Sequence, residues 1–474
     1  MRRFPLACLC AAALLLAAGL LLLPRFSAAG PSGPGDSVFL LSDRGIDQVL
    51  RLSIRNQYDS YTVRQEGGGF MIEGLPMEQA NPEYVRMLLE ESARVEYGAA
   101  VAGGKAEPEL YGLDGAQAEI AIDYADGEHL TLLLGNEEPV SAGRYFMEKG
   151  AEDVLLMKNS RALRFLMPRE KFIHYEIVPF AGFPSPLSAV KNLRLSGRAF
   201  PRDIVIEELR GDSVKDMRDA SSFGVATHLI RSPGLHEIDQ TECIEVFASL
   251  TGLLNKDVLA YNCTDGELDA YGFNDPLAKA EFDFQIDADS PPEHIVLRVA
   301  PYQGGYILVR DDQRIVHLIE NEAFIRTSYE KLAMRWFLTP FITDLESLAL
   351  EFEDGKYPFI FRGEGNRDLE VLLDGKPLAI GRFRKFYTLL TSAANDGVLL
   401  DQPVPETRPL MSLVFNYKDP LKAPDTMRLF KGALRRVNVE VNGRTEFAML
   451  QKYLDAVKTA AAALPGEGDF TAEW

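Results

Sequence analysis

The feature that most constrains the fold of this chain is an alternation of apolar and polar residues that returns three times. Leu50, Leu52 and Ile54 alternate with polar residues, and the same period of two recurs within residues 190–206 and 348–361. A period of two indicates strands that are buried on one face, and glycines such as those at 67–69 supply the turns between them. The chain is therefore expected to contain three groups of antiparallel strands.

One helix is expected in each of these three regions. Asn81 is a suitable N-cap, Pro82 fits the first helical position, and residues 85–92 have apolar side chains at helical spacing. Residues 239–242 resemble a capping box ahead of a second helix, and residues 383–390 repeat the helical spacing. The prediction is an α+β chain in which each region is an antiparallel sheet with one main packed helix.

A four-residue motif occurs twice, 160 residues apart, and the helices expected to begin at Pro82 and Glu242 are separated by the same 160 residues. Two independent features that share one offset indicate an internal duplication. A structural role is favoured over ligand binding, because the glycine lets the chain turn while its neighbours pack. The two copies are Tyr111-Gly112-Leu113-Asp114 and Tyr271-Gly272-Phe273-Asn274.

The sequence therefore predicts three tandem repeat-like modules. A single helix covers only part of one face of a sheet, so contacts between modules are expected to bury the remainder. The predicted segments are a membrane anchor or signal at 1–29, a flexible tether at 30–36, modules at 37–180, 181–340 and 341–465, and a tail at 466–474.

The first 29 residues carry the signal for location. Pro5 to Pro24 is a run of twenty residues without a charge, long enough for a transmembrane helix to cross the ~30 Å hydrocarbon core of a bilayer. Arg2 and Arg3 favour a cytoplasmic N-terminus. We expect a single-pass protein of the cell membrane with an extracytoplasmic body. The alternative is a secretory signal, cleaved at the small residues 27–29.

The first copy of the motif and the residues after it resemble a bacterial repeat. Residues 111–114, residues 119–122, the turn at 126–127 and residues 132–135 are similar to the domain-of-unknown-function family DUF 4340. The similarity extends over about residues 40–170 and is weaker at the second copy. The resemblance implies an envelope protein with an N-terminal membrane helix and a β-rich body, often encoded beside ABC-type exporters and gliding-motility-like auxiliary components. It implies no catalytic residues.

Charge and motifs exclude several classes of function. The 474 residues include 50 Lys plus Arg against 70 Asp plus Glu, a net charge of -20, and such a surface repels the phosphates of nucleic acid. The sequence has no Gly-x-Ser-x-Gly elbow, no His-Glu-x-x-His helix and no phosphate-binding loop. We therefore expect no enzymatic activity, no cofactor and no nucleic-acid partner.

Cys243 and Cys263 are the only cysteines of the body. Outside the cytoplasm these two cysteines could form a disulfide that links the second helix to the following strand. The alternative, which the sequence supports equally, is that both are buried free thiols. Together with His228 and His236 they match no common zinc spacing, so no metal site is predicted. A nearby acidic cluster lacks the spacing of a calcium loop and is expected to be solvated. This cluster consists of Asp283, Asp287 and Asp289.

These observations lead us to expect a non-enzymatic, membrane-tethered scaffold or accessory protein with protein partners in an ABC-type transport system. The transporter association rests on the resemblance alone. An extracytoplasmic binder of carbohydrate, peptide or cell-wall polymer is the alternative, and an envelope hydrolase ranks last. Aromatic residues near the module boundaries are expected to fill the junctions, and an exposed subset would bind a partner. They are Tyr175, Phe180, Phe183, Trp336, Phe337 and Phe341.

Overall fold

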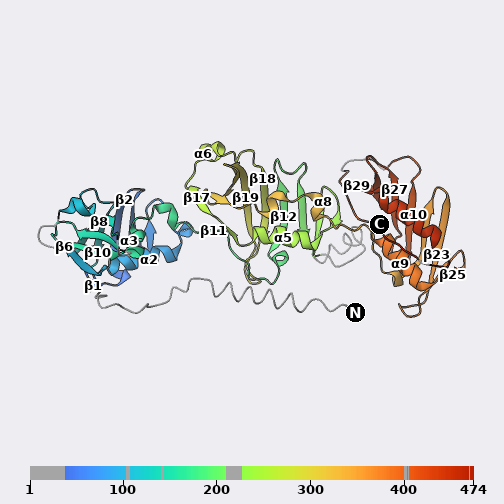
Figure 1. Ribbon diagram of the computed structural model, residues 1–474, viewed down its shortest axis with the longest axis horizontal. Helices are drawn as coiled ribbons and strands as arrows, with labels where there is room; N and C mark the ends of the chain where they lie inside the picture. Colours follow the sequence, from blue (N-terminus) through green and yellow to red (C-terminus); the bar gives the residue numbers. More distant parts are fainter. Residues whose placement is uncertain are drawn as a thin grey trace. The chain divides into compact units, whose positions relative to one another are not determined.

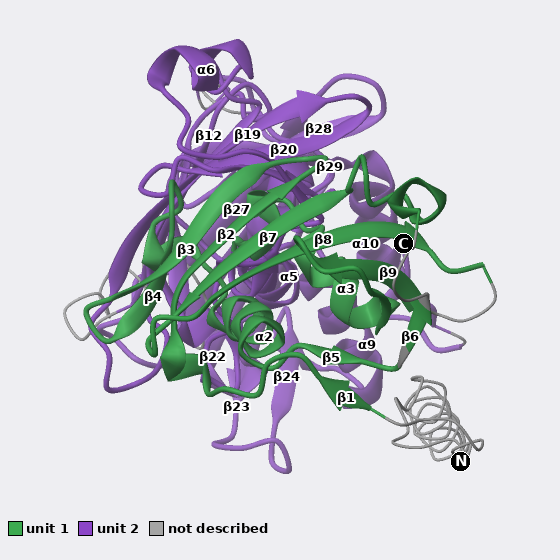
Figure 2. Cartoon of the chain, turned by 90° about the vertical axis from the view of Figure 1, so that its left-hand side faces the viewer, with its two compact units in different colours: residues 1–173 green, residues 174–474 purple. Residues whose placement is uncertain are grey.

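The computed structural model describes residues 38–102, 107–139, 143–209, 227–399, 403, 405–468 and 470–474. Antiparallel strands dominate these residues and form five sheets (Figure 1). The chain divides into two compact units, residues 1–173 and residues 174–474, which Figure 2 shows in different colours. We call them unit 1 and unit 2 and describe each separately.

Unit 1 contains one eight-stranded antiparallel sheet with the strand order β4-β3-β2-β7-β8-β9-β10-β6. Leu52 of β2 lies opposite Ile122 of β7 in its centre, and both side chains are buried. Leu50, which the sequence places on the same face, is 45% exposed because the register shifts between Val49 and Arg51. A separate two-stranded sheet pairs β1 with β5. The strands are β1 (Phe39–Leu40), β2 (Val49–Asn56), β3 (Ser60–Glu66), β4 (Gly69–Ile72), β5 (Glu96–Tyr97), β6 (Ala99–Ala102), β7 (Ala118–Tyr124), β8 (His129–Glu137), β9 (Gly143–Glu148) and β10 (Val154–Lys158).

Helix α2 (Pro82–Ala93) begins where the sequence predicts. The side chain of Asn81 accepts a hydrogen bond from the backbone N–H of Glu83 at 3.1 Å, which satisfies one of the free donors of the first turn. The helix packs against β2 and lies beside the short helix α3 (Asn159–Phe165) (Figure 2). Its buried side chains include Val85, Leu88 and Leu89.

Unit 2 begins with a nine-stranded antiparallel sheet in the order β15-β14-β13-β12-β18-β19-β20-β21-β17, and a small sheet pairs β11 with β16. Helix α5 (Gln240–Leu250) has Asp239 as its N-cap. The carboxylate of Asp239 accepts hydrogen bonds from the N–H groups of Thr241 and Glu242. The other elements are β11 (Glu176–Val178), β12 (Val190–Ser196), β13 (Ile204–Glu208), β14 (His228–Ser232), β15 (His236–Glu237), β16 (Leu253–Leu254), β17 (Asp257–Ala260), α6 (Asp265–Ala270), β18 (Ala278–Phe284), β19 (Glu293–Tyr302), β20 (Gly305–Arg310), β21 (Val316–Ile319), α7 (Ala323–Arg326) and α8 (Tyr329–Leu332).

The remainder of unit 2 forms an eight-stranded sheet, which we call the C-terminal sheet, in the order β25-β24-β23-β22-β26-β27-β28-β29. Helices α9 and α10 both bury side chains in its core, and the hydroxyl of Tyr453 on α10 donates to the carbonyl of Leu390 on α9 at 2.8 Å. The elements are β22 (Leu345–Phe352), β23 (Gly355–Arg362), β24 (Glu370–Leu373), β25 (Lys376–Pro377), α9 (Ile380–Thr391), β26 (Met411–Tyr417), β27 (Asp425–Lys431), β28 (Arg436–Val441), β29 (Arg444–Leu450) and α10 (Gln451–Ala463).

The predicted fold class of three modules with one packed helix each is wrong for the described residues. They form five sheets, and the chain divides into two compact units. The two additional sheets pair strands of two or three residues, which are too short to show a period of two in the sequence. The C-terminal sheet buries two helices, α9 and α10, and the spacing of Tyr453, Leu454 and Val457 in the sequence predicts the second of them. The module boundaries at 180/181 and 340/341 stay predictions.

The predicted transmembrane helix, and with it the single-pass location, also requires correction. No helix within the described part of the chain is both long enough and apolar enough to cross a membrane. The segment expected to cross, Pro5 to Pro24, lies outside the described residues, as does the expected tether at 30–36.

Candidate functional site

The two large sheets of unit 2 are joined edge to edge by backbone hydrogen bonds. The N–H of Met334 donates to the carbonyl of Glu237 on β15, and the N–H of Asn395 donates to the carbonyl of Arg335. The N–H of Asp396 then donates to the carbonyl of Ala448 on β29 at 2.8 Å. We call β15, residues 333–337, residues 393–399 and β29 the seam. It makes one hydrogen-bonded connection from the nine-stranded sheet to the C-terminal sheet.

Phe447 places one aromatic ring across the seam. It lies on β29 of the C-terminal sheet but belongs to the hydrophobic core of the nine-stranded sheet, where only 3% of its surface is exposed. Its ring centroid lies 5.1 Å from that of His236, 5.6 Å from that of Tyr329 and 6.0 Å from that of Phe337. These spacings are typical of favourable aromatic pairs.

A hydrogen-bonded cluster flanks the Phe447 ring. Nε2 of His236 is hydrogen-bonded to Oε2 of Glu446, and the hydroxyl of Tyr329 donates to the same oxygen at 3.3 Å. Gly234 permits this approach, because a Cβ atom there would lie 2.5 Å from Oε2 of Glu446 and 2.6 Å from the Tyr329 hydroxyl. The cluster joins β15, α8 and β29.

The protonation of this cluster follows from its surroundings. Burial opposes ionisation of Glu446, but the hydrogen bond and charge of His236, the charge of Arg444 and the Tyr329 hydroxyl outweigh it, so the pKa of Glu446 is lowered. Burial and the charge of Glu446 raise the pKa of Tyr329, which therefore remains a donor. The cluster therefore links β15 and α8 to β29 through one carboxylate oxygen.

Glu237, next to His236 on β15, is a second titratable group of the seam. Only 1% of its surface is exposed, and burial raises its pKa to about 7 from an ordinary value of 4.5. Its backbone carbonyl accepts the hydrogen bond from Met334. A carboxyl group of the seam thus changes charge near neutral pH.

The sequence singled out His228, His236, Cys243 and Cys263 without predicting a metal site. His236 is bound to Glu446, and Nε2 of His228 lies 3.0 Å from the carbonyl oxygen of Val190. Burial lowers the pKa of His228. In the regions that the structure describes, no group of three or more His, Cys, Asp or Glu side chains could hold a metal ion.

Cys243 and Cys263 are free thiols in this structure. Cys243 belongs to the main core of the nine-stranded sheet, whereas Cys263 belongs to a smaller cluster with Phe273 and Val316. Burial raises the pKa of both thiols. Of the two alternatives left open by the sequence, the structure contains the buried thiols and not the disulfide.

The acidic cluster is engaged by groups of the protein itself. Oδ1 of Asp287 accepts from the N–H of Asp289 and from the N–H and hydroxyl of Ser290, which lowers the pKa of Asp287. Asp283 is hydrogen-bonded to Asn192 and His294. These contacts make a turn and a strand-edge pair.

The duplicated motif forms the same kind of turn at both positions. Gly112 and Gly272 have φ values of 68° and 89°, in the left-handed region that favours glycine. Leu113 and Phe273 are buried beside them, and the residues that follow are exposed. The tyrosines pack on other aromatic rings, Tyr111 on Tyr145 and Tyr271 on Phe273 and Tyr302; the exposed residues are Asp114 and Asn274.

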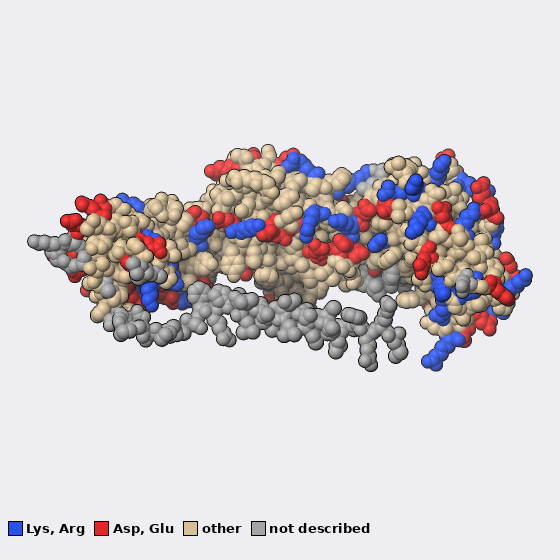
Figure 3. All heavy atoms as spheres, viewed as in Figure 1, with Lys and Arg blue, Asp and Glu red and all other residues tan. Residues whose placement is uncertain are grey.

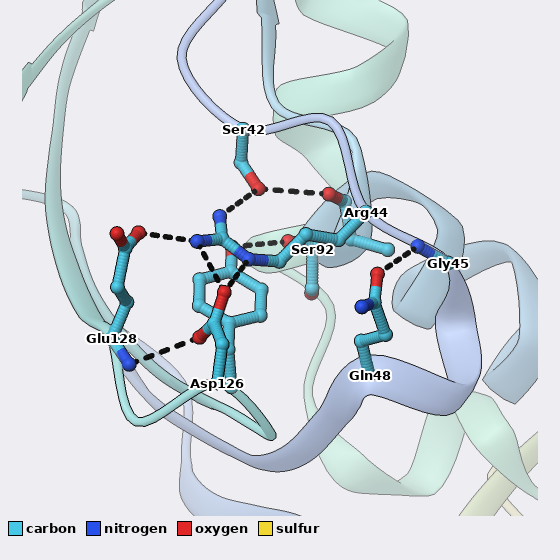
Figure 4. A network of polar contacts seen from close by, with 9 residues as sticks. Ser42, Arg44, Gly45, Gln48, Ser92, Asp126 and Glu128 are labelled. Atoms are coloured by element: carbon cyan, nitrogen blue, oxygen red, sulfur yellow. Dashed lines mark hydrogen bonds and ion pairs between the residues drawn. The ribbon is translucent and has the colours of Figure 1, made fainter.

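A polar network in unit 1 was not foreseen from the sequence. Arg44 donates from Nε and Nη2 to Asp126 at 2.9 and 2.8 Å, contacts Glu128, and lies 4.1 Å from the ring centroid of Tyr124 (Figure 4). The Arg44 side chain lowers the pKa of Asp126 together with the backbone N–H of Glu128, which is the larger cause. The network ties residues 42–48 to the turn after β7. The Asp126-Gly127 turn was recognisable, but its partner 82 residues away was not.

Comparison with known proteins gives no further assignment. No protein-family model matches the chain, and no curated protein matches it. The resemblance to DUF 4340 stays a prediction that rests on the residues quoted above.

Native protein is expected to react slowly at both body cysteines, because Cys243 and Cys263 are buried and their thiol pKa values are raised. Denaturation without a reductant should make both react fully with an alkylating reagent. Peptide mapping by mass spectrometry separates them from Cys8 and Cys10. A linked peptide pair that contains Cys243 and Cys263 would contradict this prediction.

Phe447→Ala in the full chain is expected to lower the free energy of unfolding by about 3–5 kcal/mol. It should also split denaturant unfolding of unit 2 into two transitions, because the ring belongs to one sheet and its backbone to the other. The matched control is Phe415→Ala, which removes a fully buried ring within the core of the C-terminal sheet. The control should destabilise the protein without splitting the unfolding transition of unit 2. A single transition in both variants would refute the claim that the Phe447 ring couples the unfolding of the two sheets.

Glu237 is expected to make unfolding free energy depend on pH. In the folded chain the pKa of Glu237 is about 7, above the ordinary value of 4.5. The contribution of protonated Glu237 to the free energy of unfolding is therefore fully present below about pH 4.5 and is lost as pH rises towards 7. The loss is of the order of 3 kcal/mol. Glu237→Gln should remove this slope in denaturation measured across the range, whereas the exposed carboxylate variant Glu245→Gln should retain it. An equal slope in both variants would exclude Glu237 as its source.

Proposed function

We propose that this chain is a non-catalytic accessory protein that binds protein partners through aromatic side chains of unit 2. The observation that carries the proposal is the exposure of four of the six aromatic residues near the predicted module boundaries. Their exposed fractions are 47% for Tyr175, 63% for Phe180, 40% for Trp336 and 69% for Phe341. The other two, Phe183 and Phe337, pack against the core of the nine-stranded sheet.

These exposed rings have the chemistry of protein interfaces. Aromatic side chains bury a large area with few rotatable bonds, and they are enriched in the centres of interfaces. The guanidinium of Arg335 lies 5.5 Å from the ring centroid of Trp336, and the Phe180 ring lies directly over Gly252, where a Cβ atom would clash with it. Both rings are therefore held by contacts within the chain while much of their surface stays accessible.

Charge supplies less of this recognition than apolar contact. On the face shown in Figure 3, acidic and basic side chains are interspersed over the surface. The exposed charges on this face steer a partner weakly, because salt screens each of them beyond a Debye length of about 8 Å. Contact between apolar surfaces is therefore the main source of affinity in this proposal.

The proposed partners are subunits of an ABC-type transport system. This part of the proposal is supported by the resemblance of residues 111–135 to DUF 4340. A second candidate, a binder of carbohydrate or peptide, is favoured by the same exposed rings, because aromatic faces also stack on sugars and extended chains. The two candidates differ in the ligand that the rings of Phe180 and Phe341 contact.

Crosslinking in the native host, followed by purification and mass spectrometry, is expected to recover a permease or ATPase subunit with the wild-type chain. Phe180→Ala and Phe341→Ala should each reduce that recovery about fivefold or more, since truncating an aromatic residue that is a hot spot of an interface costs over about 1 kcal/mol. Tyr58→Ala is the matched control, because Tyr58 is 66% exposed in unit 1.

The control should leave recovery at the wild-type level. Recovery without any transporter subunit, or equal recovery with all three variants, would count against the proposal. Quenching of Trp336 fluorescence by a soluble glycan or peptide, without a protein partner, would favour the second candidate.

A further inference from the structure

We propose that the His236–Glu446–Tyr329 cluster is an acid-sensitive latch that holds β29 against the nine-stranded sheet and releases it when Glu446 is protonated. This inference concerns a conformational device within unit 2 and does not depend on the proposed partners. It begins from the position of Glu446, which takes part in two connections across the seam.

Glu446 joins the seam through both its backbone and its side chain. Its carbonyl accepts from the N–H of Leu399 at 2.7 Å, and its carboxylate is bound to His236 of β15 and Tyr329 of α8. The next residue, Phe447, fills the core of the nine-stranded sheet. A change in the charge of this carboxylate therefore affects a point where backbone hydrogen bonds, side-chain hydrogen bonds and apolar packing all connect β29 to the nine-stranded sheet.

Protonation of Glu446 removes the negative charge on which its contacts with His236 and Tyr329 depend. A carboxylate accepts hydrogen bonds at both oxygens and attracts a protonated imidazole, whereas a neutral carboxyl group loses the charge and one acceptor position. The side chains of His236 and Glu446 are 22% and 18% exposed, so protons reach them from solvent without unfolding of the sheet. Gly234 leaves room for the carboxyl group, because a Cβ atom at this position would lie 2.5 Å from Oε2.

The direction of the effect follows from the groups that face Glu446. His236, Arg444 and Tyr329 lower its pKa, so the stability that it contributes is present above the ordinary glutamate range and is lost as pH falls through the lower, folded value. Tyr329 stays protonated throughout. Glu237, on the same strand as His236, is neutral below about pH 7 and adds no charge in the acidic range. Release is therefore expected below about pH 4.5.

Release would uncover specific groups. The outer edge of β29 is paired with residues 396–399 through the N–H groups of Asp396, Leu399 and Ala448. Opening the latch frees these groups together with the Phe447 ring, which gives an unpaired strand edge beside an apolar side chain. Such an edge accepts a further strand.

Hydrogen–deuterium exchange of the full chain at about pH 6 and about pH 3.5, corrected for intrinsic rates, tests the latch. Protection at Asp396, Leu399 and Ala448 should fall about tenfold or more relative to β26, because these amides lie on the strand edge that the latch holds closed. Glu446→Gln should have low seam protection at both pH values. Glu351→Gln, which removes an exposed carboxylate paired with Lys356, should behave as the wild type.

Two results with the wild-type and Glu446→Gln chains would overturn the latch. The first is that the exchange protection of the seam amides changes in parallel with that of the β26 amides at both pH values. The second is that the Glu446→Gln chain still loses seam protection when the pH is lowered. If Glu446→Gln also loses protection in β26, and so does not fold, Tyr329→Phe decides the question. Because Tyr329 donates to the carboxylate, its removal should shift the midpoint of release to higher pH. An unchanged midpoint would overturn the proposal.

Discussion

One aromatic ring, that of Phe447, belongs to the core of one sheet while its backbone belongs to another. This arrangement decides how unit 2 is held together. A ring with 3% exposure loses most of its contact with water only when both sheets are in place, so its burial stabilises the pair and neither sheet alone. The backbone hydrogen bonds of residues 333–337 and 393–399 fix the orientation of the two sheets, because they align the two sheet edges. Two sheets thereby become one compact unit.

The same seam contains two carboxyl groups whose pKa values are shifted in opposite directions. Glu237 has a raised pKa because it is buried, and Glu446 has a lowered pKa because its partners outweigh burial. Groups with opposite shifts at one junction make its stability depend on pH in both the acidic and the neutral range. The exposed aromatic side chain of Trp336 lies on a segment of the same seam.

Much of the local structure could be predicted from the sequence. The strands that contain Leu52, Leu193 and Leu348 show a period of two because one face of each is buried, and the caps at Asn81 and Asp239 mark true helix starts. The contacts of the seam could not be predicted. His236 and Glu446 are separated by 210 residues. Phe447 is followed by Ala448 and Met449, which are also buried, so alternation does not distinguish the two faces of this strand. A pattern read along one strand carries no information on which core its side chains enter. Strand pairs as short as Phe39–Leu40 with Glu96–Tyr97 have no periodicity to detect.

Native-state hydrogen exchange of the full chain in increasing denaturant tests most directly whether the seam makes unit 2 one body. Slowly exchanging amides of β19 in the nine-stranded sheet and of β26 in the C-terminal sheet report the opening of each sheet. The account predicts that their opening free energies converge on one line with the same slope. Two separate lines, each with the slope of a single sheet, would contradict it.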